Sequence, residues 1–226
     1  MSFVKNPQII KMGLVSYRNA MEQMEKIHAE VCAGGCESAL VVQHSPVVTV
    51  GNRFLPNDML VQPTEISACG VDFVHTDRGG SATVHEPGQV VVYPIFRIQS
   101  RQISVRKFVW CLEEAMIRVA SYYGVIAARD AINAGIWVGK NKLGAIGIRI
   151  TERVSKHGLA FNVVNDLSTF RYIIPCGLRD RGVTTLAREI ALIKQANIEE
   201  TVATLDPDFI GEQIAQQIVS FLVEKG

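Results

Sequence analysis

The sequence predicts a mixed α/β fold (α+β), in which a largely antiparallel sheet is flanked by helices. Short apolar runs that are typical of strands dominate the middle of the chain, and stretches with helical spacing lie toward its flanks. The elements do not alternate strictly between strand and helix, and there is no internal repeat. With 226 residues, of which 48% are hydrophobic and 20% charged, the chain fits a single domain spanning 1–226.

The first part of the chain is expected to start with a strand and a capped helix. Residues 8–14 alternate weakly in polarity, and Ser16 then precedes apolar residues at helical spacing. Two glycines at 34–35 end that helix. Apolar runs and turn residues indicate the other segments: strands at 39–43, 47–50 and 71–75, and a polar, proline-containing, mobile loop at 52–63.

The second part of the chain contains two further long helices and a hairpin. One helix follows Ser104, which can cap it, and Asp206-Pro207 begins the last one with aspartate at the cap and proline in the first turn. Residues 135–138 and 142–150 are expected to pair across a polar turn. The remaining expected elements are strands at 90–96 and 159–164 and short helices at 185–193 and 199–205.

The overall charge and hydropathy exclude several classes of protein. A formal net charge of +1 gives no global field that would attract nucleic acid or an anionic membrane. No apolar run approaches the length of a membrane span, and the N-terminal residues lack the apolar core of a signal peptide. We therefore expect a cytoplasmic protein that uses neither nucleic acid nor a membrane as a partner.

The five cysteines are odd in number and irregular in spacing, which indicates reduced thiols rather than a disulfide framework. Cys32 and Cys36 form a pair without a second Cys/His pair at matching spacing, so no metal site is expected. Cys111 lies on an apolar helical face and is expected in the core. Cys176 differs, because Pro175 and Gly177 leave it outside any regular element.

The segment 78–89 is the strongest candidate for a binding site. It contains three glycines, a proline, a threonine and a histidine within twelve residues. Glycine lets the backbone approach a ligand closely or turn with positive φ, but Gly-Gly alone favours a surface loop between two strands. Two later segments, 142–147 and 174–178, carry glycine beside Lys142 and Cys176. Together the three segments predict a functional site.

A catalytic cysteine needs a partner that helps it to reach the thiolate form. Lys142 opens a strand just after a turn, and a lysine in an apolar pocket can act as a base. The local pattern alone favours an ordinary exposed turn lysine, like Lys140. The histidines are the other candidates, with His28 expected to be solvated on its helix: His28, His44, His75, His85 and His157.

Four segments in one order resemble the lipoyl(octanoyl) transferases, the octanoyl-acyl-carrier-protein:protein octanoyltransferases of lipoate synthesis. They are Arg-Gly-Gly-Ser-Ala-Thr-Val-His-Glu-Pro-Gly-Gln at 78–89, Lys-Leu-Gly-Ala-Ile-Gly at 142–147, His-Gly-Leu-Ala-Phe-Asn-Val at 157–163 and Pro-Cys-Gly at 175–177. The resemblance runs from about Leu14 to Leu186. It implies a biotin/lipoate protein ligase-like fold.

The resemblance also implies roles for individual residues. Cys176 matches the acyl-thioester cysteine of the family, and Lys142 matches the lysine that favours its thiolate. Three positions depart from the family pattern: Val84 replaces an aromatic residue, Glu86 a glycine and Gln43 a glutamate. The residues that match the acyl-binding segments are Arg78, Gly79, Gly80, Ser81, Ala82, Thr83, Val84, His85, Ala145, Ile146, Gly147, Gly158, Leu159 and Ala160.

The activity that the resemblance implies is transfer of an octanoyl group through a cysteine thioester. The donor is octanoyl-acyl-carrier protein, and the acceptor is a lysine of the lipoyl domains of 2-oxoacid dehydrogenases and of the glycine cleavage H protein. No cofactor, ATP or metal is expected, because the thioester is already activated.

Three other functions compete with this one. They are an ATP-dependent lipoate– or biotin–protein ligase, a non-catalytic lipoyl-domain binding module, and a cysteine hydrolase with His85 or His157 as base. Neither the ligase nor the binding module needs Cys176, so its presence beside Lys142 favours the transferase.

Overall fold

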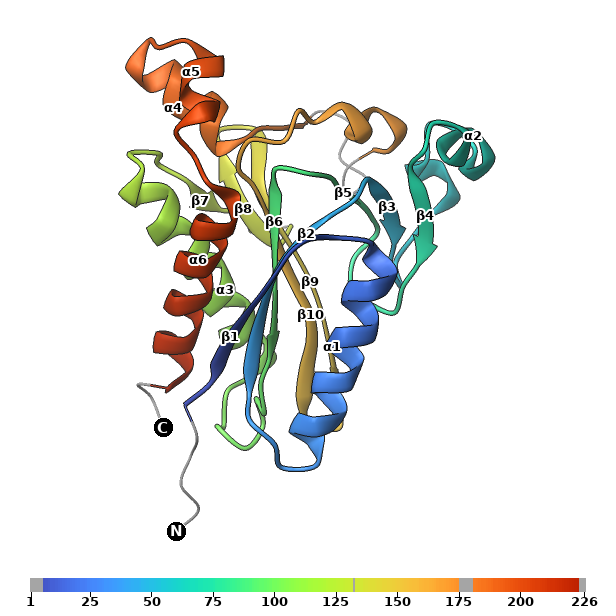
Figure 1. The fold of residues 1–226 in the computed structure, drawn as a ribbon, viewed down its shortest axis with the longest axis vertical. Helices are drawn as coiled ribbons and strands as arrows, with labels where there is room; N and C mark the ends of the chain where they lie inside the picture. The colour runs from blue at the N-terminus through green and yellow to red at the C-terminus, as the bar shows by residue number, and fades with distance from the viewer. Residues whose placement is uncertain (1–5, 132, 175–180, 224–226) are drawn as a thin grey trace.

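The computed structural model describes residues 6–131, 133–174 and 181–223. Eight strands form the main sheet: β1 (Gln8–Val15), β2 (Ser38–His44), β6 (Gln89–Ile95), β7 (Ala128–Arg129), β8 (Gly135–Val138), β9 (Asn141–Thr151), β10 (Val154–Asn162) and β11 (Gly182–Val183). Their order across this part of the chain is β1-β2-β6-β10-β9-β8-β7, with β11 also paired to β9 (Figure 1). Only β1–β2 and β9–β11 are parallel among these pairs, so the expected largely antiparallel sheet is confirmed.

A second, smaller sheet lies beside the main one. It consists of β4 (Asp72–His75), β3 (Val47–Val50) and β5 (Ala82–His85), in the order β4-β3-β5. Val48, Val50 and Val84 pack into an apolar cluster of its own. The sequence predicted β3 and β4 but not β5, because the four residues of β5 lie between glycine-rich turns and give no alternating pattern long enough to detect.

Within the described residues, the helices are α1 (Tyr17–Cys32), α2 (Pro63–Ala68), α3 (Val105–Tyr122), α4 (Leu186–Lys194), α5 (Ile198–Ala203) and α6 (Pro207–Val223), with two short 3-10 helices, η1 (Pro56–Asp58) and η2 (Ser168–Tyr172). The predicted caps are confirmed: the hydroxyl of Ser16 accepts from the N–H of Asn19, and that of Ser104 from the N–H of Lys107, both at 3.2 Å. Each such bond satisfies one of the unpaired amides at a helix start, which typically stabilises by about 1 kcal/mol.

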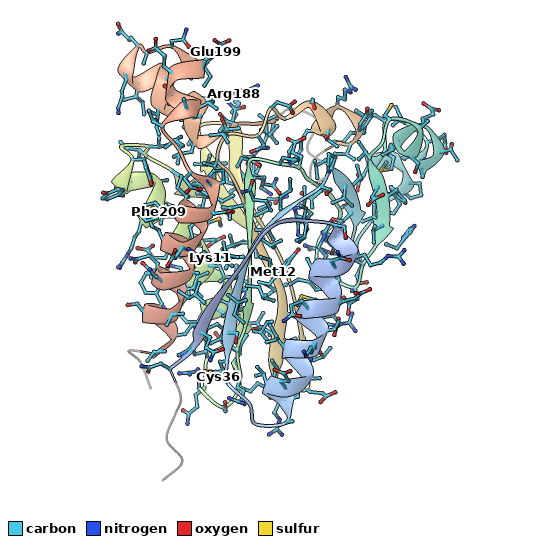
Figure 2. All side chains as sticks on the ribbon, in the orientation of Figure 1. Lys11, Met12, Cys36, Arg188, Glu199 and Phe209 are labelled. Carbon is cyan, nitrogen blue, oxygen red and sulfur yellow. The ribbon has the colours of Figure 1, made fainter. Side chains whose placement is uncertain are left out.

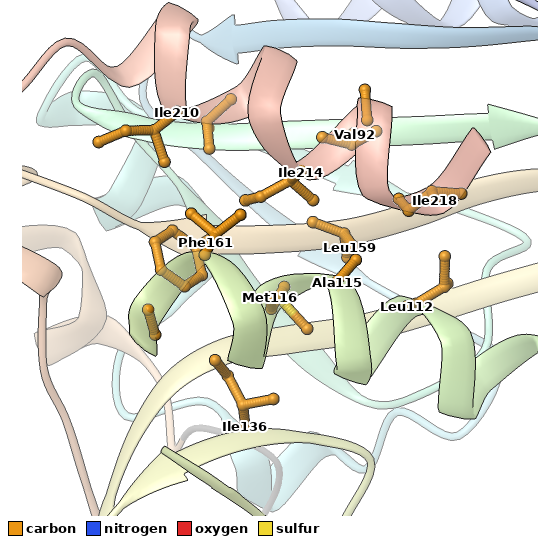
Figure 3. Close-up of a cluster of buried hydrophobic side chains, with 14 of the residues drawn as sticks. Val92, Leu112, Ala115, Met116, Ile136, Leu159, Phe161, Ile210, Ile214 and Ile218 are labelled. Carbon is orange, nitrogen blue, oxygen red and sulfur yellow. The ribbon is translucent and has the colours of Figure 1, made fainter. Parts of the chain in front are cut away.

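Helices α3 and α6 cover one face of the main sheet (Figure 1). In Figure 3, Ile210, Ile214 and Ile218 of α6 lie with Leu159 and Phe161 of β10 in one cluster of buried side chains. Complete burial of a residue such as isoleucine is worth about 1.5–3 kcal/mol relative to exposure. This layer therefore holds most of the apolar core.

Helix α1 covers the opposite face of the main sheet, where Met24 and Ile27 pack against β2 and β6. The small sheet lies near the N-terminal end of α1 and extends this second layer (Figure 1). On this face of the main sheet, α1 covers one part of β9 and β10, and the small sheet lies near another part. The candidate site lies on this face.

The exposed edge strand β1 is tied to α6 by a charged pair. Lys11 of β1 lies beside α6 in Figure 2, and its ammonium is 2.9 Å from the carboxylate of Glu212. Both groups are partly exposed, so the pair stabilises little. A lysine on an edge strand also discourages pairing with another chain.

Two expectations, one about the first helix and one about the segment between β3 and β4, are wrong. His28 is not solvated: it is buried, and its ring nitrogen lies 3.1 Å from the hydroxyl of Thr151, because the inner face of α1 meets the end of β9. The segment 52–63 is not a free loop, since it contains η1 and the N–H of Arg53 donates to the carbonyl of Gly80 at 3.0 Å. The helix α2 that follows begins at a proline in its first turn and was not predicted.

Candidate active site

A cavity of about 370 Å³ lies on the α1 face of the main sheet, where β9 and β10 meet the segment that enters the small sheet. This volume is within the usual range for small-ligand sites. Twelve of the fourteen residues that the sequence predicted for the acyl pocket line it: Arg78, Gly80, Ser81, Ala82, Thr83, His85, Ala145, Ile146, Gly147, Gly158, Leu159 and Ala160. Their role in binding stays a prediction, but one cavity brings them together from three distant segments.

Gly79 and Val84 are the two predicted pocket residues that do not line the cavity. Val84 is fully buried in the core of the small sheet. The N–H of Gly79 donates to the carbonyl of Ile148 at 3.0 Å and so joins the glycine-rich segment to β9. Both residues therefore hold the neighbouring elements together without lining the cavity.

Two glycines of the cavity wall are required by backbone packing. A Cβ on Gly158 would lie 2.0 Å from the carbonyl oxygen of Val92, and one on Gly147 would lie 2.8 Å from the carbonyl oxygen of Gly79. Gly158 therefore lets β10 approach β6, and Gly147 lets the glycine-rich segment approach β9. The sequence had suggested that such glycines leave room for a ligand.

Lys142 is buried and lines the cavity, whereas Lys140 is exposed. The side-chain nitrogen of Lys142 donates to Oδ1 of Asn133 at 2.6 Å and lies 4.9 Å from the ring centroid of Trp137. The interpretation of Lys142 as an ordinary exposed turn lysine is therefore wrong.

A β-bulge explains why Lys142 points into the cavity. Trp137 pairs with Lys142 while Ile136 pairs with Gly144, so Leu143 is an extra residue in β9. A side chain on Gly144 would point at Met116 of α3, on the opposite face. In a regular strand, residues two positions apart point to the same face, so Lys142 would point to the α3 face like Gly144. The bulge shifts it by one position, onto the cavity face with Ala145.

His85 forms a neutral part of the cavity wall. Its Nδ1 lies 2.7 Å from Oε1 of Gln89, whose amide nitrogen donates to Oδ1 of Asn162 at 2.9 Å. The oxygen of Gln89 is thus the acceptor, which places the proton of His85 on Nδ1. Burial lowers the pKa of His85 to about 4, so its imidazole is neutral near pH 7.

Aromatic rings surround this histidine. Tyr17 stacks on His85 with ring centroids 6.1 Å apart, and His44 lies 5.3 Å from His85. Nε2 of His44 lies 2.7 Å from the hydroxyl of Tyr93, and burial lowers the pKa of His44 as well. Beside these neutral rings, the cavity wall contains both apolar side chains and charged ones, Arg53, Asp58 and Arg78 among them.

His157 and Asp77 form a hydrogen-bonded pair at the end of the cavity remote from Lys142, and burial lowers the pKa of His157. Nε2 of His157 lies 2.6 Å from Oδ1 of Asp77. Burial alone would raise the pKa of Asp77, but hydrogen bonds from His157 and Lys156 outweigh it and lower the pKa to about 2. Gly158 pairs with Gly147, five residues along β9 from Lys142, and with the bulge at Leu143 this corresponds to about 14 Å of strand.

Comparison with known proteins identifies the family. The family model described as the lipoyl protein ligase A/B catalytic domain matches residues 16–209. The chain belongs to this family.

Several relatives within the family are named octanoyltransferases. That of Chloroflexus aurantiacus is 42% identical over 183 residues, which are 79% of this chain and 82% of the relative. The mitochondrial octanoyltransferase LIP2 of Arabidopsis thaliana is 39% identical over 184 residues, 80% of this chain and 78% of its own. That of Desulfotalea psychrophila is 36% identical and covers 90% of this chain and 94% of the relative.

Solved structures share the fold at low sequence identity. Lipoate-protein ligase A bound with ATP superposes with a TM-score of 0.66 at 16% identity, covering 95% of this chain and 94% of that one. Protein Ta0514 from T. acidophilum with bound lipoic acid gives a TM-score of 0.67 at 12% identity, covering 97% and 86%. The lipoate/biotin ligase fold that the sequence resemblance implied is thus confirmed.

The three departures from the family pattern lie outside the cavity lining. Glu86 is buried, and its carboxylate accepts from the side chain of Asn165 at 2.9 Å and from the N–H of Leu167 at 3.0 Å. The amide of Gln43 donates to Asp208 at 2.7 Å. With Val84 in the small-sheet core, the replacements affect how neighbouring segments are held together, not the cavity wall.

Cys176 lies outside the described residues, but the chain on each side of it is fixed beside the cavity. The N–H of Ile174 donates to the carbonyl of Asp58 at 2.8 Å, and Asp58 lines the cavity. On the other side, Val183 pairs with Lys142, and the N–H of Thr184 donates to the Lys142 carbonyl at 3.0 Å. Both flanks of 175–180 therefore contact residues of the cavity wall.

Sequence reasoning missed several residues of the cavity wall. Tyr17 and Tyr93 lie in apolar helix and strand patterns and were interpreted only as core or strand residues. Asp58 and Asn133 follow turn signals, and nothing local separates them from other loop residues. Asp58 is held by a hydrogen bond from the hydroxyl of Ser81, which the glycine-rich segment brings across. Only the folded chain identifies these four.

The depressed pKa of His85 predicts that stability falls on acidification. An unfolded histidine takes up its proton near pH 6.5, while buried His85 does so near pH 4. Between these values the unfolded state binds more protons, so the free energy of unfolding decreases as pH falls, by on the order of 3 kcal/mol for this group. Urea denaturation at about pH 7 and about pH 4 measures it. His85→Gln should show a smaller decrease; an equal decrease in both proteins would contradict the prediction.

Proposed function

We propose that this chain transfers an octanoyl group from octanoyl-acyl-carrier protein to a lysine of lipoyl domains, through a thioester on Cys176. Octanoyl transfer in protein lipoylation agrees with the octanoyltransferase relatives. The observation that carries the cysteine route is the position of Lys142. It is buried in the cavity wall, and its own backbone bonds the segment that follows 175–180.

In the first step the Cys176 thiol gives its proton to Lys142, and the thiolate attacks the octanoyl thioester carbonyl. The bond from the carbonyl to the sulfur of the carrier's pantetheine arm breaks, and the released thiolate takes the proton. One thioester replaces another, so the exchange is close to isoenergetic and the acyl-enzyme can accumulate. The neutral rings around His85 and the apolar residues of the wall, such as Ala145 and Ile146, hold the acyl chain while the acyl-enzyme exists.

In the second step the acceptor lysine attacks the Cys176 thioester as a neutral amine. The carbon–sulfur bond breaks, an amide forms, and Lys142 passes the amine's proton to the departing cysteine thiolate. Amide formation makes this step favourable overall. The residues of this chain position the chain and move the proton, and the donor thioester supplies the activation.

The partners and location follow from the same proposal. The acceptors are the lipoyl domains of 2-oxoacid dehydrogenases and of the glycine cleavage H protein, and residues 1–226 act as one catalytic domain in the cytoplasm. Among the residues that the structure describes, no helix is both long and apolar enough to cross a membrane.

A single experiment separates this function from its rivals. The protein is incubated with octanoyl-acyl-carrier protein, with and without a lipoyl domain and ATP, and intact masses are followed. The proposal expects an octanoyl adduct without ATP that transfers to the lipoyl domain. A requirement for ATP would indicate a ligase, release of free octanoate a hydrolase, and binding without any adduct a non-catalytic module.

The cavity itself is tested by Ala145→Leu. Ala145 lines the cavity and pairs with Ala160 of the neighbouring strand β10. A larger side chain at position 145 therefore occupies part of the cavity. We expect octanoyl transfer to fall at least ten-fold while butanoyl transfer falls much less, measured as initial rates with each acyl-carrier protein. Gly80 is a poorer probe, because its φ of +94° makes any substitution strained. Ala203→Leu on exposed α5 is the control; parallel losses for both acyl chains would contradict the prediction.

A further inference from the structure

We propose that Asn133 is a positioning residue for Lys142 and that its neutral amide keeps this lysine able to accept a proton. The inference rests on the proposed function and adds to it a residue that the motifs did not single out. Its starting point is the loop between β7 and β8, where Asn133 lines the cavity next to Ala134.

The contact between the two side chains is direct. The Lys142 nitrogen donates to Oδ1 of Asn133 at 2.6 Å, and the lysine is 5% exposed. Buried donors need a partner, because leaving one unsatisfied costs about 1–3 kcal/mol. The bond also selects one direction for a flexible four-carbon side chain. Asn133 is therefore one of the contacts, with the Trp137 ring, that fix where the Lys142 nitrogen lies.

Asn133 is itself held from several directions. Its backbone N–H donates to Oδ1 of Asp130 at 2.9 Å, and its carbonyl accepts from the indole of Trp137 at 3.4 Å. The carboxylate of Asp130 pairs with Arg181 at 2.6 Å. Arg181 lies just after the segment that contains Cys176, so the same loop connects the lysine to that segment.

The end of the loop makes room for the lysine stem. Gly135 has a φ of +131°, and its N–H donates to Oε1 of Glu113 on α3 at 3.1 Å. A Cβ on Gly135 would lie 3.2 Å from Cε of Lys142 and 2.3 Å from the carbonyl oxygen of Gly144. The loop is thus anchored to α3 immediately beside the side chain of Lys142, which donates to Asn133.

The choice of an amide rather than a carboxylate has a chemical consequence. A carboxylate at this distance would favour the ammonium form of its partner and hold the proton there. An amide oxygen accepts a hydrogen bond from an amine as well as from an ammonium, so Lys142 keeps its contact in both forms, and the neutral amide favours the ammonium less than a carboxylate would. The loop does carry a carboxylate, that of Asp130, but the structure pairs it with Arg181.

The test compares Asn133→Asp and Asn133→Ala. In Asn133→Asp the lysine stays an ammonium that supports the Cys176 thiolate but cannot accept the proton of the attacking amine. We expect the octanoyl adduct to form and thiol alkylation near neutral pH to be retained, while transfer to the lipoyl domain falls at least ten-fold and its pH profile moves to higher pH. In Asn133→Ala both alkylation and transfer should fall.

Controls separate this inference from the function on which it rests. Asn197→Asp, at the exposed N-cap of α5, makes the same chemical change where aspartate caps equally well. Melting curves identify any variant that fails to fold. If wild type forms no adduct, the proposed function fails. If wild type and Lys142→Ala behave as proposed while Asn133→Asp keeps the wild-type rate and pH profile of transfer, Asn133 has no such role.

Discussion

Cys176→Ala is expected to form no octanoyl adduct and to show no measurable transfer to a lipoyl domain. The proposed reaction needs a sulfur nucleophile, and alanine offers no atom that can carry the acyl group. Intact mass spectrometry after incubation with octanoyl-acyl-carrier protein, followed by rates of amide formation, measures both effects.

The other four cysteines are matched controls. Cys111 is buried in the core, Cys69 is exposed, and Cys32 and Cys36 are partly buried, so none of them is placed in the cavity wall. Alanine at each should leave the adduct intact, although Cys111→Ala is expected to lower stability by leaving a small cavity. Persistence of the adduct in Cys176→Ala would remove the proposed nucleophile.

Lys142→Ala is expected to lower the rate of transfer by about 10²–10⁴-fold, the usual contribution of a general acid–base group. Alanine removes both the positive charge near the cysteine and the proton acceptor. Lys142→Arg keeps the charge but cannot give up its proton, so transfer should also be lost. Iodoacetamide alkylation near neutral pH should be slowed more in Lys142→Ala than in Lys142→Arg. Steady-state amide formation and alkylation rates on the same samples measure this.

Lys140→Ala is the control for Lys142, because Lys140 lies two residues away in the same turn and is exposed. It should resemble wild type in both assays. Near-normal transfer by Lys142→Ala would show that the buried lysine is structural, and His85 or His157 would then have to be tested as the base.

Local sequence signals were sufficient for most elements of the fold. Ser16 and Ser104 were expected to cap their helices and do so, because a cap depends on residues three positions apart. The last helix was also expected from its aspartate, proline and apolar stripe. In contrast, β5 and α2 were missed, because β5 lies between glycine-rich turns and α2 begins at Pro63, which the sequence had placed at the end of a loop.

The sequence by itself determined the caps, the apolar stripes and the order of four motifs that mark the family. The family resemblance had selected Lys142 over Lys140, but only the tertiary structure shows why Lys142 and not its neighbour faces the cavity. Lys140 and Lys142 look alike locally, but the extra residue Leu143 shifts Lys142 to the cavity face, and Asn133 receives it there. The direction of a strand side chain depends on its pairing register, and that register is set by strands distant in sequence.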